Sequence, residues 1–273
     1  MFDLHYVEIK RKVEDIIKII HVRMEKMENS SYYRKIMEQM QDLEMVRRVK
    51  NVIGKGKGKG PEVQQYSELQ VVLHGIRVKQ SNDKMLLAFV LLLREKFYWV
   101  NDIVVYDRAL PRLERELMKA LNCSLLCPSK HGNWSVDKPT LFFMPRSQMF
   151  EFVSIVEANW SPAMLINIII LGDSFKDFTQ QSTSINIRES NTIMRNEQIL
   201  HEMALPEKPI EIPCVDNQHE GSTEPNEDFT NDDIRAFNGL SWHLFYWNRL
   251  FDDVNPQDVR TLSDYIPKIQ RDP

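Results

Sequence analysis

The chain has 273 residues, of which 42% are hydrophobic and 10% aromatic, so it can build a large packed core. This composition excludes a chain that is disordered throughout. The net charge of −4, from 35 basic and 39 acidic residues, gives no overall attraction to nucleic acid or anionic lipid. No apolar run approaches the roughly 18 residues that span a bilayer, and the start lacks a secretory signal pattern. We therefore expect a cytoplasmic location, with the nucleus as a second one, and neither a membrane nor a specific nucleic-acid partner.

The first 50 residues are predicted to form an N-terminal helical segment. Asn29–Ser31 interrupts the pattern and can cap a second helix. We predict a helical hairpin packed on the main domain; a partner-binding arm is the alternative, although two short stripes supply few heptads. Apolar side chains recur at spacings of three and four, which place them on one helix face: Val13, Ile16, Ile17, Ile20, Met24, Met27.

Residues 51–66 are predicted to be a flexible linker. Glycine and lysine alternate from Gly54 to Gly60, a composition that buries no apolar area and keeps its backbone entropy. The run is not a phosphate-binding P-loop, because no lysine in it is followed by Ser or Thr. Nonspecific phosphate contact or nuclear import through its lysines is the alternative.

Residues 67–250 are predicted to be a Rossmann-like α/β domain, a mostly parallel sheet with helices on both faces. Near-continuous apolar strands separated by helical patterns are typical of parallel sheets, whose crossover helices cover each face. The helices are expected at 85–95, capped by Ser81–Asp83, and after Pro111. The strands are expected at 69–75, 103–107, 122–127, 140–145, 168–174 and around His243.

A ligand crevice is expected where the carboxyl ends of these strands meet. Gly75 is one glycine of the three in a dinucleotide fingerprint, and Asp107 can accept hydrogen bonds from ribose hydroxyls. Strand-end polar residues are also ordinary turn formers. No catalytic residue is assigned, since Ser174 lacks the Gly-X-Ser-X-Gly elbow. The remaining predicted members are Pro145 as the floor, Arg146 with Ser147 as an anion site, and Asp173 with Ser174.

The cysteines and histidines indicate no metal site. Three cysteines match no zinc framework, and the seven histidines lack ligand spacing. Cys127 precedes Pro128, a pair that can present a thiolate to haem iron; burial as a small hydrophobe is the alternative. The acidic stretch 216–233 is predicted to be a disordered loop, and residues 251–273 a C-terminal tail.

Several segments together resemble the sensitivity-to-red-light-reduced family over about residues 69–246. They are Val105–Asp107 with its helix up to Cys123, Val136–Pro145, Asn159–Ser161, Asn167–Phe175 and Ala236–Phe245.

The resemblance implies a regulator of circadian clock input, of red-light signalling in plants, and of haem biosynthesis and clock-gene expression in animals. It brings no established catalytic activity. The chain departs from the family at two turns: Arg77 and Lys79 replace a glycine and a phenylalanine, and Arg146-Ser147 replaces His-Cys. Arg77 would obstruct a pyrophosphate, whose close approach needs glycine.

Two classes of function therefore fit the sequence. The first is a regulatory protein acting through unidentified protein partners or a small-molecule ligand. The second is a nucleotide- or S-adenosylmethionine-dependent enzyme of Rossmann-like fold. We favour the regulator and leave the cofactor open.

Overall fold

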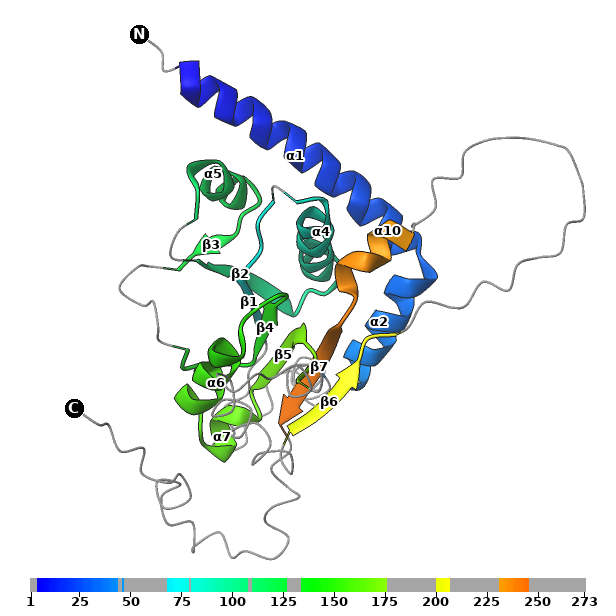
Figure 1. Ribbon diagram of the computed structural model, residues 1–273, viewed down its shortest axis with the longest axis vertical. Coiled ribbons are helices and arrows are strands. Elements are labelled where there is room, and N and C mark those ends of the chain that lie inside the picture. The colour runs from blue at the N-terminus through cyan, green and yellow to red at the C-terminus, as the bar shows by residue number, and fades with distance from the viewer. Residues whose placement is uncertain are drawn as a thin grey trace, which may run out of the picture.

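The computed structural model describes residues 4–43, 46, 68–78, 80–107, 110–126, 134–175, 200–206 and 231–245. They form a mixed α/β architecture around a seven-stranded sheet (Figure 1). The strand order is β3-β2-β1-β4-β5-β7-β6. In chain order the strands are Leu69–His74 (β1), Val100–Tyr106 (β2), Ser124–Leu125 (β3), Thr140–Met144 (β4), Ile168–Asp173 (β5), Leu200–Ala204 (β6) and Leu240–Phe245 (β7).

The prediction of a mostly parallel sheet is confirmed. Strands β1 to β5 pair in parallel, and β7 pairs antiparallel with both β5 and β6. In strands β4 and β5 every residue is buried except Asp173 at the end of β5, as expected of a sheet covered on both faces.

Each face of the sheet has its own hydrophobic cluster, because successive strand side chains point to opposite faces. In β4, Leu141 and Phe143 join one cluster, while Phe142 and Met144 join the other. The first face is covered by α4 (Ser81–Lys96) and α5 (Arg112–Ala120), and the second by α6 (Met149–Ala158) and α7 (Pro162–Leu165). We call these the α4/α5 face and the α6 face.

The N-terminal residues form two helices, α1 (Leu4–Asn29) and α2 (Ser31–Asp42), separated at Ser30. The Ser30 hydroxyl accepts a hydrogen bond from the backbone N–H of Tyr33 at 3.0 Å, which caps α2 as predicted. Helix α1 runs over α4 and α5 (Figure 1), with Ile20 and Met27 fully buried. That α1 and α2 pair as a hairpin stays a prediction.

Two details differ from the sequence prediction. Helix α4 begins at Ser81 with Gln80 as its cap, so Ser81–Asp83 form the first turn rather than the cap. Strand β6 is not predicted, because its Leu-His-Glu-Met-Ala sequence has no apolar run. None of the helices in the described ranges is both long and apolar enough to cross a bilayer.

Several predicted segments lie outside the described residues. They include the linker 51–66, most of the acidic stretch 216–233 and the tail 251–273. The end of the acidic stretch is helical rather than a loop, because Asn231–Ile234 form α10, which continues into the 3-10 helix Arg235–Phe237 before β7. The proposed domain boundaries stay a prediction.

Candidate functional site

The carboxyl ends of four parallel strands meet at one edge of the sheet. His74 pairs with Tyr106, and Met144 pairs with Gly172, so the residues that follow these strands lie in a row across the edge. Because β1 also pairs with β4, the row is continuous from β2 to β5. Four predicted crevice residues occupy it: Gly75, Asp107, Pro145 and Asp173.

Gly75 brings the turn after β1 against the end of β4. Its φ is +75°, in the left-handed region that favours glycine, and a Cβ there would lie 3.2 Å from the carbonyl oxygen of Pro145. The predicted turn glycine is therefore required for a close backbone approach between β1 and β4.

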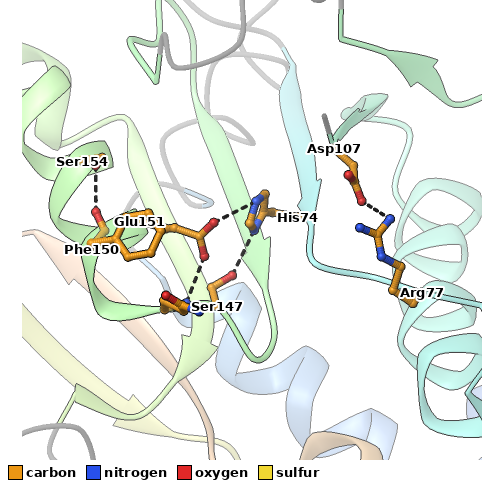
Figure 2. A network of polar contacts seen from close by, with 8 residues as sticks. His74, Arg77, Asp107, Ser147, Phe150, Glu151 and Ser154 are labelled. Atoms are coloured by element: carbon orange, nitrogen blue, oxygen red, sulfur yellow. Dashed lines mark hydrogen bonds and ion pairs between the residues drawn. The ribbon is translucent and has the colours of Figure 1, made fainter. Parts of the chain in front are cut away.

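The carboxylate of Asp107 is already paired with a neighbouring arginine. The guanidinium of Arg77 forms an ion pair with the Asp107 carboxylate (Figure 2), and the same nitrogen, Nη1, lies 3.6 Å from the buried Glu114 carboxylate. Arg77 is predicted to obstruct a pyrophosphate, and it also forms an ion pair with the carboxylate that is predicted to bind ribose.

Asp83 links two turns from inside the protein. Its side chain is 1% exposed, accepts the backbone N–H of Arg77 at 2.7 Å and forms an ion pair with Arg146. The other guanidinium arm of Arg146 donates to Gln80 Oε1 at 2.8 Å. The predicted anion-binding role of Arg146 therefore competes with a buried carboxylate that already holds it.

Asp173 and Ser174 lie at the β5 end of the row. Asp173 pairs with Leu240 of β7, and the backbone N–H of Ser174 donates to Gly239 at 2.9 Å. Both residues therefore help to join β5 to the turn before β7.

A second polar cluster lies on the α6 face of the same edge, and consists of His74, Ser147 and Glu151 (Figure 2). His74 Nδ1 lies 3.1 Å from Ser147 Oγ, and His74 Nε2 lies 3.1 Å from Glu151 Oε1. The other oxygen of Glu151 accepts the backbone N–H of Gln148 at 2.9 Å, in the capping box of α6. We call these three residues the His74 cluster.

The His74 ring is held in a largely apolar surrounding. It contacts the rings of Tyr106 and Trp134, which pack on each other with centroids 4.1 Å apart. Burial lowers the pKa of His74 below its ordinary value, with Glu151 and Asp107 opposing and Arg77 reinforcing that shift. The neutral imidazole is thus the form present at neutral pH.

The sequence prediction places Ser147 at this edge but misses His74 and Glu151 as its partners. Ser147 lies 73 positions from His74, so no local motif joins them. Only the topology could have predicted this contact. His74 ends β1, Ser147 follows β4, and these two strands are parallel neighbours in the sheet.

Cys127, the predicted haem-responsive thiol, lies outside the described residues. Cys123 is buried, and burial raises the pKa of its thiol to about 11, which disfavours the reactive thiolate. In the described ranges no three His, Cys, Asp or Glu side chains gather as a metal site would need.

A shallow groove of about 450 Å³ lies away from this edge, between α2 and strands β6 and β7. Polar residues of α2, including Gln39 and Asp42, line it beside Met203 and Leu244. Gln39 ties α2 to the sheet by donating to the carbonyl of Ala204 at 3.1 Å.

Comparison with known proteins identifies the family. The family model described as SRR1 domain matches residues 18–244. The chain belongs to this family. It is 26% identical over 242 residues to "Protein SENSITIVITY TO RED LIGHT REDUCED 1" of Arabidopsis thaliana, covering 87% of this chain and 74% of that protein.

A second relative is the "SRR1-like protein" of Mus musculus, 27% identical over 128 residues, which cover 45% of this chain and 51% of the mouse protein. No solved structure matches the chain significantly. The resemblance drawn from the sequence is thus confirmed at the level of the family.

Proposed function

We propose that this SRR1-family protein is a regulator in light- and clock-linked signalling. It acts in the cytoplasm or nucleus through protein partners, with a small-molecule ligand as a second means of control. The observation that carries the proposal is the alignment of 87% of the chain with an Arabidopsis protein named for reduced sensitivity to red light.

The ion pairs of the α4/α5 face argue against a nucleotide-dependent role. Arg77 pairs with Asp107, and Arg146 pairs with Asp83. A dinucleotide would have to displace the first pair to reach the ribose acceptor, at the cost of separating two opposite charges.

The test is physiological. In the organism that encodes the chain, its deletion is expected to change the period or amplitude of a clock-gene reporter and the response to red light, and re-expression of the chain restores both. Unchanged rhythms and red-light responses after deletion contradict the proposal.

A link to haem is the finer form of this proposal, and Cys127 is its candidate residue. Haemin titration followed by the Soret band is expected to show saturable binding that Cys127→Ala removes. Cys214→Ala is the matched control, because it removes a thiol elsewhere in the chain. Equal binding by all three proteins contradicts the role of Cys127.

The second candidate is a Rossmann-like enzyme that uses a nucleotide or S-adenosylmethionine. The observation that favours it is the strand order β3-β2-β1-β4-β5, which is typical of doubly wound nucleotide-binding sheets, with Gly75 after β1 and Asp107 after β2. Gly75, Asp107, Pro145, Arg146, Asp173 and Ser174 would line its crevice.

Calorimetry with S-adenosylmethionine, a nicotinamide dinucleotide and ATP separates the two candidates. The regulatory proposal predicts no saturable binding to the unmodified chain. Saturable binding that Asp107→Ala removes, and that Asp102→Ala leaves unchanged, favours the enzyme. Asp102 is a suitable control because its ion pair with Lys138 is half exposed.

A further inference from the structure

We infer that Ser147, His74 and Glu151 form a nucleophile site that takes an acyl group from an ester or thioester. Of its three residues only Ser147 belongs to the crevice considered above, and the site does not depend on the regulatory role. Its three side chains come from the end of β1, the turn after β4 and the first turn of α6.

The distances match the relay of nucleophile, base and orienting carboxylate. Ser147 Oγ and Glu151 Oε1 each lie 3.1 Å from a different nitrogen of the His74 ring. Both separations fall in the hydrogen-bonding range expected of such a relay.

The hydrogen bonds also fix the tautomer. Since a carboxylate only accepts, the Nε2 facing Glu151 carries the proton. Nδ1 is then the lone-pair nitrogen, and it faces the hydroxyl of Ser147 (Figure 2). His74 is thus oriented to take the proton of Ser147, and Glu151 acts as the positioning residue.

Glu151 is itself held in place. Its Oε2 accepts the backbone N–H of Gln148 at 2.9 Å, so the carboxylate has one oxygen on the helix end and one on the imidazole. A base whose orienting group is fixed by the backbone keeps its geometry when substrate arrives.

The backbone places the hydroxyl at a sharp strand-to-helix turn. Arg146, directly before Ser147, has a φ of +60°, unusual for a residue with a side chain, and its guanidinium is anchored on Asp83 and Gln80. Helix α6 begins two residues after Ser147, so its N-terminal dipole favours negative charge near the hydroxyl.

The surroundings favour a small acyl group. Ser147 is 4% exposed, and a Cβ built on Gly75 would lie in van der Waals contact with its hydroxyl, at 3.8 Å, so the turn at Gly75 bounds the room beside Oγ. Phe150, exposed at the start of α6, offers an apolar contact beside Glu151 (Figure 2).

The reaction balances without a further reagent besides water. Ser147 Oγ attacks the carbonyl carbon while its proton moves to His74 Nδ1, and the C–O or C–S bond to the leaving group breaks as His74 returns the proton to that group. The acyl-serine is then hydrolysed by water, whose proton passes through His74 while a carboxylic acid leaves and the hydroxyl is restored.

The test uses the full chain, a short-chain alkyl fluorophosphonate and the two acyl donors p-nitrophenyl acetate and S-phenyl thioacetate. Mass spectrometry of peptides is expected to find the phosphonyl and acetyl adducts on Ser147. Continuous release of nitrophenol or thiophenol would indicate turnover, and a single burst would indicate a stable acyl-serine; both support the site.

Variants assign the roles. Ser147→Ala abolishes the adduct, and His74→Gln slows labelling by about 10²–10⁴-fold, the usual contribution of a general base. Ser154→Ala is the matched control, since this serine lies on α6, the helix that carries Glu151, and bonds only the carbonyl of Phe150 at 2.7 Å among the contacts drawn in Figure 2. It is expected to label at the rate of the unmodified chain.

The pH profile separates a base from a structural histidine. The labelling rate should be constant through neutral pH and fall only in acid, because burial holds the pKa of His74 below its ordinary value. Glu151→Gln should move this fall to still lower pH, because the carboxylate raises that pKa.

If His74→Gln does not fold, Ser147→Cys in the otherwise unmodified chain gives the same information through its rate of alkylation by iodoacetamide. A thiol beside the imidazole is expected to react faster than free cysteine at pH 6. The site is overturned if the folded chain gives no Ser147 adduct, if His74→Gln labels at an unchanged rate, or if the cysteine variant reacts no faster than free cysteine.

Discussion

At the carboxyl edge of the sheet, the α4/α5 face and the α6 face differ in how their polar side chains are paired. On the α4/α5 face, Arg77 and Arg146 are paired with Asp107 and Asp83. On the α6 face, a neutral imidazole lies between a hydroxyl and a carboxylate. The ion pairs of the α4/α5 face join neighbouring turns, whereas on the α6 face a lone pair of His74 is directed at the hydroxyl of Ser147. Two sites a few residues apart on one edge of the sheet can therefore suit different chemistries.

Acidification should cause a large loss of unfolding free energy, and this loss should come mainly from the α6 face. His243 is fully buried on the α6 face, where its ring packs against that of Phe175 with centroids 3.9 Å apart. Burial lowers its pKa to about 3. Because the unfolded chain takes up this proton near pH 6.5, stability is fully present above that pH and falls as pH drops toward 3, on the order of 1 kcal/mol per pH unit.

Urea unfolding at pH 7 and pH 4.5 measures this loss. His243→Phe should reduce the difference between the two pH values by on the order of 2 kcal/mol. His74→Gln should reduce it by less, because Glu151 and Asp107 partly offset the effect of burial on His74. An unfolding free energy that falls equally in all three proteins contradicts this source of acid sensitivity.

Removing the buried Asp83 carboxylate should destabilise the protein strongly from the α4/α5 face. Asp83→Ala leaves the N–H of Arg77 without its acceptor and the guanidinium of Arg146 without its ion-pair partner, and about 2–3 kcal/mol of unfolding free energy should be lost. The side chain of Arg146 is 44% exposed, which keeps the loss below that of a fully buried pair.

Asp102→Ala is the control for this change. Its bond to Lys138 at 3.1 Å joins two partly exposed side chains, so the loss should stay below about 1 kcal/mol. Similar losses for Asp83→Ala and Asp102→Ala, measured by urea unfolding at pH 7, would remove the distinction between an internal and a surface carboxylate.

The close approach of β1 and β4 should have a smaller, separable effect. Gly75 and Gly239 have φ values of +75° and +78°, so alanine at either position costs about 1–2 kcal/mol in backbone strain. Only at Gly75 would the new Cβ also meet a backbone oxygen, at 3.2 Å, while at Gly239 nothing lies within 4 Å. Thermal unfolding should therefore show a lower Tm for Gly75→Ala than for Gly239→Ala, and equal values would contradict a close approach at Gly75.

The sequence predicts the strands that are buried on both faces, because their apolar runs need no long-range information. It misses β6 at the sheet edge, because the Leu200–Ala204 sequence has neither a continuous apolar run nor a regular alternation of polar and apolar residues. It also predicts that Gly75, Asp107 and Pro145 share an edge, since this follows from parallel pairing alone.

The chemistry of the edge was harder to predict, because it depends on side chains that meet across long separations. Arg77, in the turn after β1, reaches Asp107, which follows β2. His74, at the end of β1, meets Ser147 from the turn after β4 and Glu151 from α6. Nothing in the local sequence of Ser147 distinguishes a hydroxyl next to an imidazole from an ordinary turn serine.

The tautomer of His74 tests the contrast between the two faces most directly. Proton-detected ¹⁵N NMR of the imidazole at pH 7, assigned by comparison with His74→Gln, should show a neutral ring with the proton on Nε2 and a hydrogen-bonded lone pair on Nδ1. Ser147→Ala should shift the Nδ1 resonance alone. A protonated ring at pH 7, or a proton on Nδ1, would contradict the arrangement in which His74 accepts from Ser147 and donates to Glu151.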